Sequence, residues 1–379
     1  MSFRQVLNWL SMIVFAMHLS ALDLYLTRLI PGFSYVALLG MLGVSVLFAL
    51  FDKRFHVFPK TQWLLLSMLL VNSCYGLSFI ASPPVNLSNA AFPWFHLIWL
   101  MVLFNWFSTV SLATVQRACW ISLILACASI WGDVVNPGTF SNLDYRAAGF
   151  AGDANDGARA LVFSLAGVLL CRNSRSGFTW QESVVVLFTL FTVLATASRS
   201  GLLLYTLVIL GFYSMISFRA KLGFVISGLL FVLVAFQANL GDSINSRALD
   251  RLSPSSQQEL VSKDSSRLDV VFEYLEIIAT NPLGIGREGN AQREVNAHNT
   301  LLNIGAEAGL LAALGLLLVL FSLANLTRIY PFSLWGCLML VHIGVVFSTS
   351  NVWYSRSWLM FIAVMVAAAM CQYQRNEQQ

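Results

Sequence analysis

The stretch that decides the fold is ESVVVLFTLFTVLATA (182–197), followed by SRSG (198–201) and LLLYTLVILGFYSMIS (202–217). Each apolar run is close to the ~17–25 residues that cross the hydrocarbon core of a bilayer. The four residues between the runs are small or polar and include Arg199, whose charge is costly at bilayer depth. The pattern therefore predicts two membrane helices joined by a tight turn at one surface, rather than one long helix.

Similar apolar runs cover most of the chain. Of the 379 residues, 58% are hydrophobic and 11% are charged, whereas soluble domains carry roughly 25% charged residues. Spans are predicted near 6–22, 33–50, 62–81, 92–108, 118–135, 157–171, 182–197, 200–217, 222–238, 300–324, 332–350 and 355–371. We therefore expect an all-α fold, a polytopic membrane helix bundle with about twelve (ten to twelve) transmembrane helices.

One long polar segment, from Gln237 to Asn299, interrupts these runs and holds half of the acidic residues. It divides the chain into 1–238 with helices one to nine, a loop at 239–298, and 299–379 with helices ten to twelve. If the N-terminus lies inside, the short inner segments carry more Arg and Lys than the short outer ones, as the positive-inside rule requires. This orientation places the loop outside. No cleavage site follows the first apolar run, so we expect the first helix to be uncleaved.

Several function classes are disfavoured by what the sequence lacks. The net charge of +4 is ordinary, and no basic stripe with interleaved aromatic residues suggests a nucleic-acid partner. The six cysteines lie in or at the ends of apolar spans without a CxxC spacing, so neither a disulfide framework nor a metal site is expected. No Walker loop, dinucleotide fingerprint or Asp-x-Asp motif is present, and we expect no cofactor. Charged residues at bilayer depth are scarce, which weakens a transport function.

The outer loop predicts a short amphipathic helix near 267–279. The apolar residues at helical spacing are Leu268, Val271, Phe272, Leu275 and Ile278. With Ser266 as its N-cap, Arg267 takes the first helical position, where a cation opposes the macrodipole at a cost of ~0.3–1 kcal/mol. Helix N-terminal amides and a guanidinium together suit a phosphate. The alternative is a solvated arginine, or one paired with Asp269 or Glu273.

Three further residues could act at the outer surface. Arg199 is held at the headgroup level, where it could meet a lipid-linked phosphate or simply snorkel to the interface. Arg356, just outside the last span, is a candidate of the same kind. His298 lies at a helix start, which favours the neutral imidazole that a general base requires. A histidine in such a place is more often a cap or a hydrogen-bond donor.

The helix predicted after the loop carries polar residues on one face. Asn299, Asn303 and Glu307 recur every four residues and so share that face. Gly305 and Gly309 form a Gly-xxx-Gly pair that permits close helix packing. We expect Glu307 to be buried against another helix in a structural role, either protonated or paired with an arginine.

Several short motifs occur in order between about 145 and 311. The later ones are Ser266-Arg267, Asn281-Pro-Leu-Gly-Ile-Gly286, Ala297-His-Asn-Thr-Leu-Leu302 and Glu307-Ala-Gly-Leu-Leu311. The upstream ones are Arg146-Ala-Ala-Gly-Phe150 with Asp153-Ala-Asn155, and Ala197-Ser-Arg-Ser-Gly201. Together they resemble the O-antigen ligase/polymerase family. Its members are bacterial inner-membrane glycosyltransferases that act on undecaprenyl-diphosphate-linked glycans.

This resemblance implies a function and a set of site residues. In the ligase branch, the functional set is the arginine of the Ser-Arg turn, the arginine that opens the loop helix and the histidine before span ten. These match Arg199, Arg267 and His298. The implied reaction is a metal-independent, inverting transfer of a glycan from undecaprenyl diphosphate to a hydroxyl of lipid A–core, on the periplasmic face. Arg356 and Asn299 are expected to assist substrate binding.

Two alternatives stay open. About thirty residues separate Arg267 from His298, which is shorter than in typical lipopolysaccharide ligases. A polymerase that uses the same donor, with another glycan as acceptor, therefore fits as well. The second alternative is a transporter or flippase for lipid-linked glycans, which performs no covalent chemistry. Membrane lipids are expected partners in every case.

Overall fold

Helices form the regular structure throughout the part of the chain that the structure describes. The computed structural model describes residues 3–30, 59–81, 87–141, 146–172, 180–218, 257–293, 297–350 and 352–377, with single residues within 32–50 and 221–228. The α-helices are α1 (Phe3–Leu19), α2 (Leu22–Leu29), α4 (Gln62–Ala81), α5 (Leu87–Thr109), α6 (Leu112–Val135), α7 (Ala154–Leu170), α8 (Trp180–Ala195), α9 (Arg199–Met215), α12 (Gln257–Thr280), α13 (Gly286–Ala291), α14 (Thr300–Ala308), α15 (Leu310–Thr327), α16 (Phe332–Ser348) and α17 (Arg356–Glu377). Short 3-10 turns lie at η1 (Pro59–Thr61), η2 (Gly149–Ala151) and η4 (Val352–Tyr354). The predicted all-α fold is confirmed for these residues.

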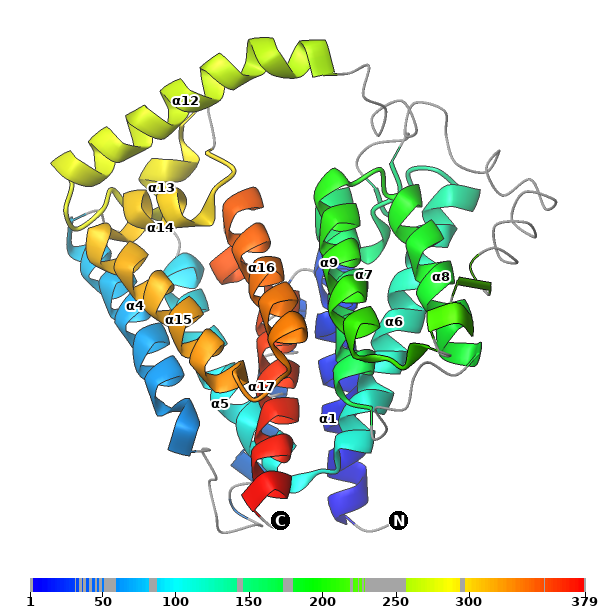
Figure 1. Ribbon diagram of the computed structural model, residues 1–379. Coiled ribbons are helices and arrows are strands. Elements are labelled where there is room, and N and C mark those ends of the chain that lie inside the picture. Colours follow the sequence, from blue (N-terminus) through cyan, green and yellow to red (C-terminus); the bar gives the residue numbers. More distant parts are fainter. Residues whose placement is uncertain are drawn as a thin grey trace.

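The long helices run side by side, and α12 lies across one end of the bundle (Figure 1). Both termini lie at the opposite end (Figure 1). We call the end that carries α12 the α12 end. A polar helix that crosses the ends of apolar ones is the arrangement expected of an element at a membrane surface.

Four described helices are long and apolar enough to cross a membrane, or up to five when the bent pair α1–α2 is taken as one span. That pair bends by 84°. Shorter apolar helices occupy most of α8 and all of α9 and α16. The predicted spans near 33–50 and 222–238, and the loop before Gln257, fall mostly outside the described residues. The count of about twelve and the limits of the outer loop therefore stay predictions.

Helix α7 is the core helix, although its predicted span was the shortest. It is buried along its length except at Asn155 and Asp156, and it packs against α6, α9 and α17. Phe163 of α7 stacks on Phe361 of α17 with ring centroids 4.7 Å apart. A helix that neighbouring helices shield from lipid can be short and can begin with charged residues, because its ends do not meet the bilayer core.

The predicted break between the two apolar runs at 182–217 is confirmed. Helix α8 ends at Ala195 and α9 begins at Arg199. Ala197 adopts a left-handed backbone with φ 50°, and the Ser198 hydroxyl caps α9 by accepting from the Gly201 amide at 3.0 Å. The turn is therefore made by one reversed residue and one N-cap.

The single helix predicted at 300–324 is wrong, because the chain breaks at Gly309 between α14 and α15. Gly309 has φ 88° and ψ 171°, a region that is essentially restricted to glycine. A Cβ at this position would collide with the carbonyl oxygen of Pro282. The Ile285 amide also donates to the Ala306 carbonyl at 2.8 Å. The 281–286 motif therefore packs on the break, and both motifs form one structural unit.

The predicted start of the loop helix is also wrong. Helix α12 is described from Gln257, ten residues before Arg267, so Arg267 lies inside the helix and Ser266 is not its N-cap. Residues 257–264 include several good helix formers, and tertiary context carries the helix through the two serines that follow. The argument that Arg267 meets a helix N-terminus therefore no longer holds.

The predicted apolar stripe of this helix divides between two environments. Ile278 is buried against Leu302 and Ala306 of α14, together with Tyr274, which was not part of the predicted stripe. Gly305 makes this contact possible, because a Cβ there would lie 2.6 Å from Ile278 Cδ1. The close packing expected of Gly305 is therefore found with α12. The other large apolar side chains of the stripe are exposed, namely Leu268, Phe272 and Leu275.

Candidate functional site

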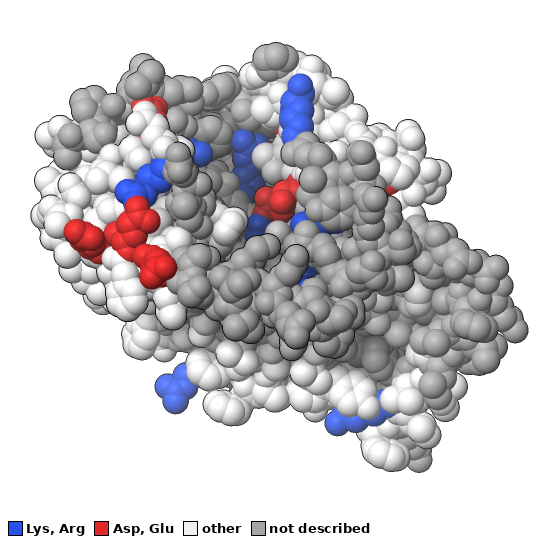
Figure 2. All heavy atoms as spheres, turned by 90° about the horizontal axis from the view of Figure 1, so that it is seen from above, with Lys and Arg blue, Asp and Glu red and all other residues white. Residues whose placement is uncertain are grey.

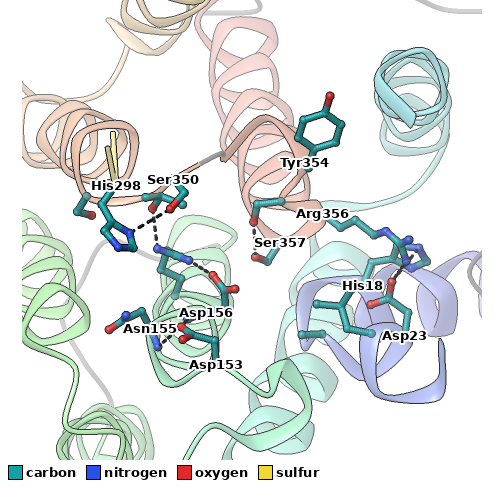
Figure 3. A pocket seen from close by; sticks show the side chains of 16 residues that line it. His18, Asp23, Asp153, Asn155, Asp156, His298, Ser350, Tyr354, Arg356 and Ser357 are labelled. Carbon is teal, nitrogen blue, oxygen red and sulfur yellow. Dashed lines mark hydrogen bonds and ion pairs between the residues drawn. The ribbon is translucent and has the colours of Figure 1, made fainter. Parts of the chain in front are cut away.

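A polar cavity of about 390 Å³ opens at the α12 end. This volume falls within the ~300–1,000 Å³ of small-ligand sites. Its charged and imidazole-bearing lining residues are His18, Asp23, Asp153, Asp156, Arg159, His298 and Arg356. They come from the α1–α2 bend, the start of α7, the segment just before α14 and the start of α17 (Figure 3). Four helix ends that are distant in sequence thus converge on one chamber.

Three non-glycine residues with positive φ occur among the described residues: Ala21, Ala197 and His298. Ala21 and His298 line the cavity, and Ala197 lies one residue before the Ser198 cap of α9. Such backbone conformations cost of order 1–3 kcal/mol and gather at functional sites. Their positions make the α12 end the first place to look for a functional site.

His298 is held in position by both its backbone and its ring. Its φ is 44°, a left-handed conformation in which His is enriched. Ring atom Nδ1 lies 3.0 Å from the Ser350 hydroxyl oxygen, which belongs to the α16–α17 connection. The ring reaches into the cavity (Figure 3). A proton on Nδ1, donated to Ser350, gives the tautomer in which Nε2 is the acceptor.

A buried carboxylate lies across the cavity from His298 (Figure 3). Asp23 follows the α1–α2 bend and has no exposed surface. Its Oδ2 accepts from Arg356 and lies 3.8 Å from His18 Nε2. His18 Nδ1 donates to the Val14 carbonyl at 2.9 Å, so Nε2 is the ring atom that faces Asp23. The other oxygen of Asp23, Oδ1, has no hydrogen-bond partner in the part of the chain that the structure describes.

The start of α7 supplies a second acidic wall. Asp153 caps α7 by accepting from the amides of Asn155 at 2.8 Å and Asp156 at 3.2 Å. Asp156 pairs with Arg159. Arg159 is 5% exposed and also donates to Thr349 Oγ1 at 2.6 Å. Both cavity arginines therefore already have a carboxylate partner.

The two upstream motifs meet at Asn155. Arg146 donates from Nη2 to Asn155 Oδ1 at 3.1 Å and from Nε to the Thr196 carbonyl at 3.2 Å. The Ser198 hydroxyl donates to the same Asn155 oxygen at 2.9 Å. The Ser-Arg turn is therefore fixed directly to the cavity wall. Arg199 follows as the first residue of α9, with an exposed side chain.

The predicted site residues differ in where they lie relative to the cavity. His298 and Arg356 line the cavity, and Arg199 lies beside its wall. Arg267 is on α12, and its side chain lies outside the described part of the structure. Asn299 caps α14, accepting from the Leu301 and Leu302 amides at 3.0 and 3.3 Å, so its Oδ1 has a structural contact. The cation at a helix start, expected at Arg267, is found instead at Arg199 and Arg356.

Sequence reasoning missed several charged groups. Asp23 and Arg159 were hidden within or beside apolar spans, although an ionisable residue in such a place is itself a signal. Arg287 was passed over because it stands just after the Leu-Gly-Ile-Gly motif. Its guanidinium lies over the ring of Tyr354, 4.0 Å from the centroid, a cation–π contact. Burial raises the pKa of Tyr354, so this cavity-lining phenol is neutral at pH 7.

A second buried polar cluster lies on the α13–α14 side. Glu307 accepts from Tyr75 Oη at 2.6 Å and from Asn290 Nδ2 at 3.1 Å. Asn290 also donates to Asn303 Oδ1 at 2.9 Å and accepts from Tyr274 Oη at 2.9 Å. The expectation that Glu307 is buried against another helix is confirmed, with Tyr75 of α4 as that contact.

Figure 2 looks down on the α12 end. Basic side chains lie next to acidic ones in a hollow of this face, and the described residues form no large patch of one sign (Figure 2). Among the residues that the structure describes, no three His, Cys, Asp or Glu side chains are grouped as they would be for a metal ion. The site therefore offers paired charges and hydrogen-bonding groups to a ligand.

The apolar helices and the polar chamber at one end define an integral membrane protein with a ligand site at its surface. Residues 184–317 match the family model described as O-antigen ligase. No curated protein matches the chain. The match confirms the resemblance to the O-antigen ligase/polymerase family, because these residues carry its domain and include Arg199, Arg267 and His298. At this level the protein is a membrane-bound, glycosyl-transferring enzyme.

Proposed function

We propose that the protein transfers a glycan from undecaprenyl diphosphate to an acceptor hydroxyl at the α12 end, on the periplasmic face of the bacterial inner membrane. The observation that carries this proposal is His298, which combines a left-handed backbone, a ring bonded to Ser350 and a place in the cavity wall. It also lies inside the segment that matches O-antigen ligases. An imidazole held in this way suits a general base.

In the proposed reaction, the acceptor oxygen attacks the anomeric carbon of the glycan. His298 Nε2 takes the hydroxyl proton as the new C–O bond forms. The bond between the anomeric carbon and the diphosphate breaks, and undecaprenyl diphosphate leaves with the electron pair. Attack from the face opposite the leaving group inverts the anomeric centre. General base catalysis of this kind contributes about 10²–10⁴-fold in rate.

The diphosphate is expected beside the cavity rather than inside it. The cavity holds three carboxylates, and both of its arginines are paired with them. A diphosphate would meet repulsion there, whereas Arg199 presents an exposed guanidinium at the start of α9. We propose that Arg199, together with Arg267 on α12, neutralises the departing diphosphate, which is the electrostatic role that usually contributes most to catalysis. Arg356 takes another part, because it pairs with Asp23.

The acceptor decides between two forms of this function. A ligase uses lipid A–core, and a polymerase uses the glycan of a second lipid-linked repeat. The chain between Arg267 and His298 is short and folds back on α14 through the Ile285–Ala306 hydrogen bond. This compact arrangement favours keeping the polymerase as the second candidate.

The test uses purified protein in detergent, a lipid-linked glycan extracted from the host cells, and acceptor. Release of free undecaprenyl diphosphate is the readout, because a transporter or flippase releases none. His298→Ala is expected to lower the turnover about 10²–10⁴-fold and to leave donor affinity nearly unchanged. Retained turnover in that variant, or no release by the wild type, would reject the proposal.

A further inference from the structure

The unpartnered oxygen of Asp23 needs an explanation. Asp23 is fully buried, yet its Oδ1 makes no hydrogen bond with any residue that the structure describes. Buried polar atoms are nearly always paired, and an unsatisfied charged group costs more than a neutral one. Asp23 lines the cavity, so this buried oxygen lies in the cavity wall with its hydrogen-bonding capacity unused by the described residues.

The carboxylate is fixed in its direction. Arg356 and His18 both approach Oδ2, and the left-handed Ala21 turns the chain between α1 and α2. The carboxylate therefore cannot turn without losing its ion pair. In Figure 3 the group formed by Asp23, His18 and Arg356 lies on the side of the cavity opposite His298.

The chemistry of the cavity selects a neutral donor of hydrogen bonds. Its lining has three carboxylates (Asp23, Asp153 and Asp156) against two guanidinium groups (Arg159 and Arg356). An anionic ligand would be repelled by the unpaired oxygen. A molecule with several hydroxyl groups can donate to it instead, and a sugar is such a molecule.

We propose that this cavity holds a sugar residue of the glycan substrate, and that Asp23 Oδ1 accepts a hydrogen bond from one of its hydroxyl groups. The inference rests on the proposed glycosyl transfer and names a specificity-determining residue for it. The sugar belongs to the donor or to the acceptor, since both have the same chemistry. Asp23 would hold it against the side of the cavity where His298 lies, with the diphosphate outside near Arg199.

The test is the isosteric change Asp23→Asn. Because Arg356 holds one oxygen of the side chain, the amide NH₂ must take the place of Oδ1, and an acceptor becomes a donor at the same point. Affinity is measured for three probes: the lipid-linked glycan extracted from host cells, the glycan released from that extract by mild acid, and undecaprenyl diphosphate without sugar. We expect a loss of about tenfold or more for a sugar-bearing probe and no change for the bare carrier.

The three probes distinguish the possible outcomes. A loss for the lipid-linked glycan alone assigns the site to the donor, and a loss that includes the free glycan shows that the sugar binds there without its carrier. Unchanged affinity for all probes, or an equal loss for the bare carrier, overturns the proposal. If the sugar-dependent loss is found but the wild type releases no undecaprenyl diphosphate, the sugar site stands and the proposed transfer fails.

Two further variants keep the test decisive. Glu182→Gln changes a partly buried carboxylate that pairs with Arg172 at 2.8 Å, outside the cavity, and is expected to leave all three affinities unchanged. If Asp23→Asn does not fold, the double variant Asp23→Asn with Arg356→Gln removes both charges together, which is milder than leaving one unpaired. It must show the same sugar-dependent loss.

Discussion

Two buried carboxylates at the α12 end have opposite surroundings. Glu307 accepts hydrogen bonds on both of its oxygens, from Tyr75 and Asn290. Asp23 has Arg356 on one oxygen, and its other oxygen lies in the cavity wall without a partner among the described residues. A buried carboxylate with both oxygens paired joins helices, whereas one with a free oxygen keeps a place for a ligand. The difference separates scaffold from site within one end of the molecule.

The Glu307 cluster and the Asp23 cluster also connect different helices. The Glu307 cluster joins α4, α12, α13 and α14 through Tyr75, Tyr274, Asn290 and Asn303. It therefore fixes the position of α12, the helix that carries Arg267. The Asp23 cluster joins the α1–α2 bend to α17 and forms a wall of the cavity. Changes in the first cluster should lower stability, and changes in the second should alter ligand binding.

The largest expected effect is at the break that supports the Glu307 cluster. Gly309→Ala places a side chain in a backbone region that is essentially restricted to glycine, and against the Pro282 carbonyl. We expect a loss of about 3 kcal/mol or more in stability, so that little folded protein accumulates in the membrane. The yield of monodisperse protein after detergent extraction measures this.

Gly336→Ala is the matched control, because no atom lies within 4 Å of the added Cβ in α16. Its yield should equal that of the wild type. Normal accumulation of Gly309→Ala would mean that α14 and α15 can join without this break, and the contact with the 281–286 motif would lose its structural role.

The next largest expected effect is a difference in stability between variants of the two carboxylates. Both Tyr75 and Asn290 donate hydrogen bonds to Glu307. Glu307→Gln replaces one of the two acceptor oxygens with an NH₂ group, so that one of these donors then faces another donor. We expect stability to fall by about 1–3 kcal/mol, seen as a lower Tm in detergent. Asp23→Asn weakens the ion pair with Arg356 but meets no second donor, so its Tm should fall less than that of Glu307→Gln. Equal falls in Tm for the two variants would remove the distinction between scaffold and site.

The sequence predicted what depends on local composition. Long apolar runs specify α4, α6 and α17 because each is long and apolar enough to span a bilayer. The break before Arg199 was visible because a charged residue and a glycine interrupt apolar sequence. The burial of Glu307 could be predicted because it shares one face of a helix with other polar residues, and because nearby glycines allow another helix to pack closely.

What the sequence could not predict depends on contacts between distant segments. Asp23 and Arg356 stand 333 residues apart, and nothing local to either residue indicates their pairing. The Gly309 break needs the carbonyl of Pro282 to explain it. The first turn of α12 was misplaced because Ser265 and Ser266 fit an N-cap as well as a helix interior. In the candidate site, His298 and Arg356 were found, whereas Asp23 was missed because it lies beside the first apolar run.

The smallest expected effect concerns the link from the Glu307 cluster to α12. Burial raises the pKa of Tyr274 on α12, and a free tyrosine loses its proton near pH 10. The unfolded chain therefore deprotonates first, and the free energy of unfolding falls as the pH rises above about 10. Tyr274→Phe removes this titration together with the hydrogen bond to Asn290, at a cost of about 0.5–1.5 kcal/mol at neutral pH. Its Tm should start lower at pH 8 and then decline less steeply toward pH 11 than that of the wild type. Parallel declines in the two proteins would mean that Tyr274 is solvated, and that the Glu307 cluster does not extend to the helix that carries Arg267.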